Sequence, residues 1–114
     1  MIKAAIVLLA DTETSGELGR AVNALTTAKE FKQAGDEVAL VFDGAGTKWI
    51  PELSNPEHKY SRLFGEVRDK VAGACEYCSK AYGVGAEVEA QGVRLLSEFD
   101  HHPSLHGYAS RATR

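Results

Sequence analysis

Two continuous apolar runs in the first third of the chain predict buried strands. Residues 2–10 read IKAAIVLLA and residues 37–42 read EVALVF, and polar or glycine residues bound both runs. Such unbroken runs are typical of strands covered on both faces, as in a parallel sheet. The segment 17–34 places apolar residues on one helical face and predicts a helix that is closed by Gly35. Residues 1–46 therefore predict a β-α-β unit with parallel strands and a right-handed crossover.

The rest of the chain predicts two further strands with helices between them. The predicted elements are a short helix at 47–53, a helix at 58–69, a strand at 71–74, a helix at 78–91, a strand at 93–98 and a polar tail at 103–114 that forms at most one helical turn. Strands that alternate with helices predict an α/β fold, a three-layer sandwich with a parallel four- to five-stranded sheet and helices on both faces. We expect residues 1–114 to form a single domain.

Ligand chemistry in such sheets collects at the carboxyl ends of the strands. The segments that follow the four predicted strands are 11–16, 43–48, 75–78 and 99–102. We expect these four loops, which lie far apart in the sequence, to meet at one edge of the sheet.

Composition indicates which classes of partner the protein lacks and in which compartment it works. The net charge of -3 offers no basic surface, so we expect no nucleic-acid partner. No apolar run reaches the roughly 18–20 residues that span a bilayer, and residues 4–10 lack the cleavage site of a signal peptide, so we expect a cytoplasmic protein without a membrane partner. Thiols stay reduced there, which favours redox, metal-binding or packing roles for the two cysteines over a structural disulfide.

The most informative motif is Cys75-Glu-Tyr-Cys78. Cys75 falls at the end of the third predicted strand and Cys78 in the first turn of the next helix. Free N–H groups and the positive end of the helix dipole stabilise a thiolate at such a position. We therefore expect a lowered thiol pKa and a nucleophile that attacks disulfides or carries a persulfide sulfur.

Other interpretations of the thiol pair stay open. Zinc needs two more ligands, and the spacing of the candidates His101, His102 and His106 matches no common zinc motif, so we expect no metal site. A thioredoxin-type dithiol normally follows the first strand, whereas this motif follows the third. Two small thiols that only fill space are the simplest alternative. The chain has no GxGxxG or Walker A motif, and we expect no cofactor.

Several other residues at the predicted edge are candidates for a pocket. The loop residues are Asp11, Thr12, Asp43 and Gly44. The loop at 43–48 has the glycines to hold an anion beside Lys48, although a plain turn explains it equally well. The aromatic candidates Trp49 and Tyr77 either line the rim above the cysteines or pack at a subunit contact.

The order of the elements, with Cys-x-x-Cys-x-x-x-Tyr-Gly at 75–83, resembles the DsrE/DsrF-like (YchN-like) family of small sulfur-relay proteins over roughly residues 2–99. The resemblance implies homo-dimers, trimers or hexamers, and a sulfane sulfur passed from donor to acceptor proteins as a persulfide on Cys75, with Cys78 at the second, variable position. Tyr82 stands where the family often has arginine, and residues 103–114 offer no fifth apolar strand. Since proteins normally cover a free sheet edge, we expect an oligomer.

Two functional hypotheses follow. The first is a sulfur carrier or sulfurtransferase-like protein with Cys75 and Cys78 as its catalytic thiols; its activity, if it is an enzyme, is persulfide sulfur transfer. The alternative is a non-catalytic, oligomeric α/β domain that binds a small ligand or a protein and whose thiols are structural.

Overall fold

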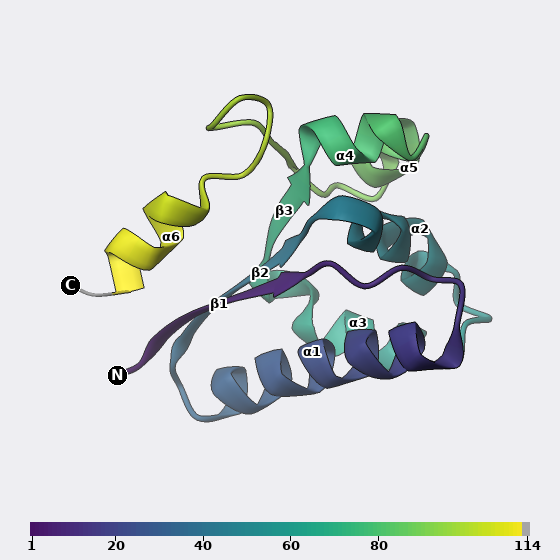
Figure 1. Ribbon diagram of the computed structural model, residues 1–114. Coiled ribbons are helices and arrows are strands. Elements are labelled where there is room, and N and C mark those ends of the chain that lie inside the picture. The colour runs from purple at the N-terminus through teal and green to yellow at the C-terminus, as the bar shows by residue number, and fades with distance from the viewer. Residues whose placement is uncertain (113–114) are drawn as a thin grey trace.

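The computed structural model describes residues 1–112, and a four-stranded parallel sheet forms its centre (Figure 1). The strands are β1 (Lys3–Leu8), β2 (Glu37–Phe42), β3 (Val71–Cys75) and β4 (Leu95–Leu96). They lie in the order β1-β2-β3-β4, and each pairs in parallel with the next. The predicted parallel α/β fold is confirmed, with four strands among the described residues.

Helices connect the strands and pack against the sheet. They are α1 (Ser15–Gln33), the 3-10 helix η1 (Gly44–Lys48), α2 (Trp49–Ser54), α3 (Ser61–Val67), the 3-10 helix η2 (Arg68–Lys70), α4 (Glu76–Ala81), α5 (Gly85–Ala90) and α6 (Leu105–Ala112). In Figure 1, α1 and α3 lie below the sheet, whereas α6 lies above it and contacts β1. Within residues 1–112, no helix has the length and apolar character needed to cross a membrane.

The main core lies between the sheet and α1. Ala21, Leu25 and Ala28 form the buried stripe of α1. They belong to one cluster with Phe42 of β2, whose ring meets that of Phe64 edge-on at 6.0 Å. Because every crossover proceeds in the same direction along the sheet, right-handed connections bring α1 and α3 to the same face.

Successive strand residues point to opposite faces, and this alternation places the first cysteine. Phe42 and Ala74 belong to the main core cluster, so the next residue of β3, Cys75, points to the other face. Cys75 is nevertheless fully buried, with 0% of its surface exposed. Its covering therefore comes from a different part of the chain than α1.

The prediction of one continuous helix over residues 78–91 is wrong. The chain forms α4 and α5 instead, and Gly83 between them has a φ of 74°, a left-handed conformation that glycine adopts without steric cost. The fourth strand, predicted at 93–98, is confined to two residues, because the chain folds back on itself through a bridge between Phe99 and His102.

The tail is more helical than predicted. In place of one turn, residues 105–112 form α6, and Ser104 provides the start signal because its Oγ accepts a hydrogen bond from Gly107 N at 3.1 Å. Residues 113–114 of the predicted tail lie outside the described residues.

Candidate functional site

Three loops at the carboxyl end of the sheet bring four reactive side chains together. One ligand-type atom from each of Asp43, Cys75, Cys78 and His102 lies within 4.8 Å of all the others. We call these four residues the thiol cluster. The segments after β2, β3 and β4 thus meet at one edge, as the order of the strands predicted.

Cys75 occupies the junction between β3 and α4. It is the N-cap residue of α4, with φ -55° and ψ 125°, and its Sγ accepts a hydrogen bond from Cys78 N at 3.3 Å. The Cys-x-x-Cys spacing produces this contact, because the side chain of an N-cap residue reaches the backbone N–H three positions later. The predicted position of the motif at a strand-to-helix junction is confirmed.

The prediction of a lowered pKa is wrong for Cys75. Burial, which removes water from the thiol, is the largest of the effects that raise the pKa of Cys75 to about 12, and the nearby Cys78 thiol and Asp43 carboxylate act in the same direction. The N–H of Cys78 lowers this pKa, but its effect is smaller than that of burial. Cys75 is therefore a neutral thiol at neutral pH when no cation is near it.

A tight turn covers Cys75. Phe99 and His102 exchange two backbone hydrogen bonds of 2.9 and 2.8 Å, and Asp100 and His101 between them have φ values of 49° and 65°. Two consecutive positive φ angles are typical of a type I′ turn, and Asp and His tolerate the left-handed region better than most residues. The turn places the imidazole Nδ1 of His102 3.2 Å from the Sγ of Cys75.

Contacts to the first turn of α4 anchor this turn. Tyr77 N donates a hydrogen bond of 2.9 Å to the carbonyl oxygen of His101, and the ring of Tyr77 lies 5.1 Å from that of His102. The imidazole of His101 places its Nδ1 3.2 Å from a carboxylate oxygen of Glu76. Of the three histidines considered as zinc ligands from sequence, the thiol cluster contains His102 but neither His101 nor His106.

Asp43 enters the cluster from β2, as the first residue after the strand. Its Oδ1 accepts a hydrogen bond from Gly44 N at 2.8 Å and lies 3.7 Å from the Sγ of Cys78. The following 3-10 helix packs tightly against the end of β1, since a Cβ at Gly46 would lie 2.1 Å from the carbonyl oxygen of Leu8. A glycine at this position is therefore required to hold the Asp43 loop close to the sheet.

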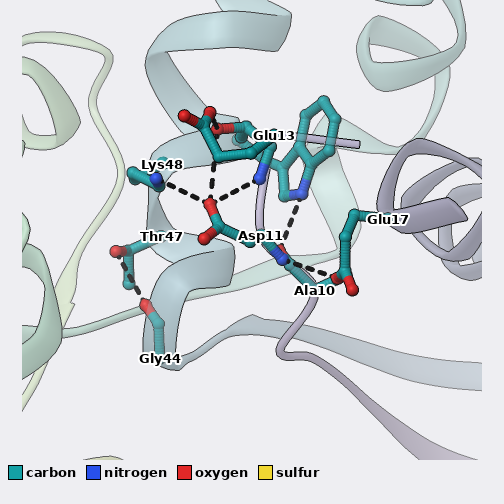
Figure 2. Close-up of polar contacts among 9 residues, drawn as sticks. Ala10, Asp11, Glu13, Glu17, Gly44, Thr47 and Lys48 are labelled. Carbon is teal, nitrogen blue, oxygen red and sulfur yellow. Dashed lines mark hydrogen bonds and ion pairs between the residues drawn. The ribbon is translucent and has the colours of Figure 1, made fainter. Parts of the chain in front are cut away.

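A second polar group at the same edge is built around an ion pair (Figure 2). Lys48 Nζ lies 2.6 Å from Asp11 Oδ1, which also accepts a hydrogen bond of 2.6 Å from Thr12 N. The ammonium group lowers the pKa of Asp11, and the carboxylate raises the pKa of Lys48. Lys48 is therefore already neutralised, which argues against the anion-binding interpretation of the loop at 43–48.

The remaining pocket candidates lie in two places. Thr12 and Trp49 contribute to a shallow cavity of about 250 Å³ whose lining residues include neither cysteine. Trp49 is only 2% exposed, and its Nε1 donates a hydrogen bond of 2.9 Å to the carbonyl oxygen of Ala10. Tyr77 is 58% exposed and lies beside the thiol cluster through its contact with His102.

Fold and site together define a parallel α/β protein with two nearby cysteines after its third strand. The chain is 29% identical over 87 residues to the uncharacterized protein MJ0733 of Methanocaldococcus jannaschii, an alignment that spans 76% of this chain and 70% of that protein. No protein-family model matches the chain, and no solved structure gives a significant match. The comparisons therefore provide a distant relative without an assigned activity.

Proposed function

We propose that the protein is a sulfur carrier of the DsrE/F type that holds a persulfide on its thiol pair. The observation that carries this proposal is the approach of two thiols, a carboxylate and an imidazole to within 4.8 Å at the carboxyl edge of the sheet. Such groups supply both the nucleophile and the proton acceptors that sulfur transfer needs. The resemblance of residues 75–83 to the family motif supports the same function.

The exposure of the two thiols divides their roles. Cys75 is closed from solvent, whereas Cys78 is partly exposed, so the donor reaches Cys78 first. Asp43 accepts the proton of the Cys78 thiol, and the thiolate attacks the outer sulfur of the donor persulfide. A bond forms between Cys78 Sγ and that sulfur, the donor S–S bond breaks, and the donor leaves as a thiolate that takes up a proton.

The sulfur then moves inward to Cys75. His102, with its Nδ1 3.2 Å from Cys75 Sγ, accepts the thiol proton. Cys75 Sγ attacks the outer sulfur, the bond from that sulfur to Cys78 breaks, and Cys78 leaves as a thiolate that is reprotonated. The persulfide is now held at the buried position, and an acceptor thiolate removes the sulfur by the reverse route through Cys78.

Persulfide-selective labelling followed by peptide mass spectrometry tests the proposal. After incubation with glutathione persulfide, we expect a gain of one sulfur atom on the peptide that carries both cysteines. Cys78→Ser abolishes loading, because it removes the accessible thiol, whereas Cys75→Ser still loads Cys78. The chain has only two cysteines, so the double variant gives the background. If neither Cys75 nor Cys78 of the wild-type protein gained sulfur, the proposal would be refuted.

A second candidate is a non-catalytic binding or assembly domain with packed thiols. The observation that favours it is the burial of Cys75 together with its raised pKa, since a neutral, closed thiol is inert. The same loading experiment separates the two functions. An unloaded protein that still binds a partner supports the second one.

We also propose that the protein forms a homo-oligomer. β1 lies at the edge of the sheet and has β2 as its neighbour, and apolar side chains near the strand ends are exposed, among them Leu9 at 60% and Phe99 at 66%. Exposed edges and large apolar side chains are features that subunit contacts cover. Light scattering coupled to size-exclusion chromatography measures the mass directly, and a species of 12.3 kDa would contradict the proposal.

A further inference from the structure

The thiol cluster has the composition of a metal centre. We propose that Asp43, Cys75, Cys78 and His102 together bind one borderline-soft divalent cation of the zinc class. This inference is independent of sulfur transfer, since it concerns the reduced protein without any donor. Two sulfurs, one imidazole nitrogen and one carboxylate oxygen form a ligand set that suits zinc and does not suit Mg²⁺ or Ca²⁺, which prefer oxygen.

The distances fit a tetrahedral ion. Zinc bonds of about 2.3 Å to sulfur and about 2.1 Å to nitrogen or oxygen place neighbouring ligand atoms about 3.3–3.8 Å apart. Cys75 Sγ lies 3.2 Å from His102 Nδ1, and Cys78 Sγ lies 3.7 Å from Asp43 Oδ1. All four atoms lie within 4.8 Å of one another, so even the widest pair needs a contraction of only about 1 Å to bind one ion.

Contacts outside the cluster hold the ligands in place. The N–H of Cys78 points at Cys75 Sγ, and the N–H of Gly44 points at Asp43 Oδ1. The ring of Tyr77 restrains that of His102. Outer contacts of this kind orient metal ligands and raise affinity. The four ligands are therefore positioned before an ion arrives.

The balance of charge gives a reason for a cation. With both thiols and the carboxylate ionised, the cluster carries three negative charges in a partly buried space, and such an arrangement is strongly unfavourable without a counter-ion. A divalent cation reduces the net charge to one negative unit. Sequence alone makes the Cys-x-x-Cys pair and His102 candidate zinc ligands but predicts no metal site, because their spacing matches no common zinc motif and the fourth ligand, Asp43, lies in the loop after β2.

Cobalt substitution tests the site. The full chain, reduced and treated with a chelator, is titrated with Co²⁺ in the absence of any sulfur donor. We expect one Co²⁺ per chain, with the visible bands of a tetrahedral ion and a thiolate-to-cobalt charge-transfer band, and displacement of the ion by Zn²⁺. His102→Ala and Cys78→Ser each remove a ligand atom, and Asp43→Asn replaces a carboxylate ligand with a neutral amide, so each variant weakens binding by about 10- to 100-fold or more.

The matched control is His101→Ala, which changes the neighbouring histidine of the same turn and leaves the four ligands intact. Asp43→Asn retains a side-chain oxygen that accepts the hydrogen bond from Gly44 N, so the loop keeps its conformation. Circular dichroism of the metal-free variants checks that each one folds.

Two results would overturn the metal site: no tetrahedral cobalt spectrum in the wild-type protein, or equal affinity in the wild type, His102→Ala and Asp43→Asn. Because the titration contains no persulfide, its failure says nothing against sulfur transfer. Conversely, a protein that binds zinc but takes up no sulfur refutes only the proposed function.

Discussion

Two polar regions lie at the same edge of the sheet, and their construction differs. In the region around Asp11, the carboxylate is paired with Lys48 and with a backbone N–H. In the thiol cluster, burial is the main cause of the raised pKa of Cys75, and the Cys78 thiol and the Asp43 carboxylate raise it as well. In the Asp11 region the opposite charges are already paired. In the thiol cluster the raised pKa of Cys75 opposes full ionisation unless a positive charge, such as a metal ion, is present.

This difference indicates where chemistry is to be expected. The partly exposed ion pair between Asp11 and Lys48 contributes little to stability and leaves neither charge unpaired. A buried thiol such as Cys75 keeps its proton until a base, an electrophile or a metal ion changes the balance. Four measurements test this difference between the two regions.

The largest effect concerns the reactivity of the two thiols in the metal-free protein. The alkylation rate of Cys75 at neutral pH should be about a thousandfold or more below that of a free thiol, because a pKa near 12 leaves almost no thiolate. The rate should rise with pH as the pH approaches 12, while Cys78 reacts first. Mass spectrometry resolves the two sites, and unfolding in denaturant should equalise them. Rapid alkylation of folded Cys75 would contradict the burial described above.

The next effect concerns Trp49, which supports the Asp11 region from the core. Trp49→Ala should lower the free energy of unfolding by about 3–5 kcal/mol, since it leaves a cavity and an unpaired carbonyl at Ala10. Denaturant titration measures the change. Trp49→Phe retains most of the volume and should lose less. A loss below about 1 kcal/mol in the alanine variant would show that the indole is not packed in the core.

Zinc should stabilise the folded protein, and the expected gain is smaller than the loss caused by Trp49→Ala. At a free concentration one hundred times the dissociation constant, binding adds about 2.7 kcal/mol to the free energy of unfolding. The two thiols must release protons on binding, so the added stability should decrease as the pH falls. Thermal melts with and without zinc measure it, and Cys78→Ser should show a much smaller increase than the wild type at the same zinc concentration. An unchanged midpoint for the wild type would contradict the metal site.

The smallest effect belongs to the partly exposed ion pair between Asp11 and Lys48. Lys48→Met should change the midpoint of thermal unfolding only slightly at physiological ionic strength. Lys48 lowers the pKa of Asp11, so the contribution of the pair is present above the ordinary value of 3.8 and is lost as the pH falls through the lower folded pKa. Melts of both proteins at neutral and acid pH provide the test. We expect the difference in melting temperature between the wild type and Lys48→Met to shrink in acid, so a difference that grew in acid would contradict the prediction.

Much of the fold was predictable because it depends on local patterns. The apolar run at 37–42 coincides with β2, and Gly35 has the positive φ expected after a helix. The convergence of the loops follows from parallel strand order alone. The division of the predicted helix at 78–91 was harder to foresee, because glycine weakens a helix without always ending it.

The chemistry of the site was less predictable because burial is a tertiary property. The position of Cys75 at a helix N-terminus was visible in the sequence, but its covering by the turn at 99–102 was not. That turn lacks the Asn-Gly signal of most type I′ turns and uses Asp100 and His101 instead. The helix N–H acts on the thiol as expected, and desolvation outweighs it.

The position of Asp43 directly after β2 has a consequence for folding. Cys75, Cys78 and His102 come together once β3, β4 and the turn at 99–102 have formed, but Asp43 is 35 positions before Cys78 and arrives only when β2 pairs with β3. Because Cys75 and His102 are themselves 27 positions apart, the two loop closures have similar entropic costs. The contact of Asp43 with Cys78 depends on the pairing of β2 with β3, so the reactivity of Cys78 during refolding reports when these central strands have joined.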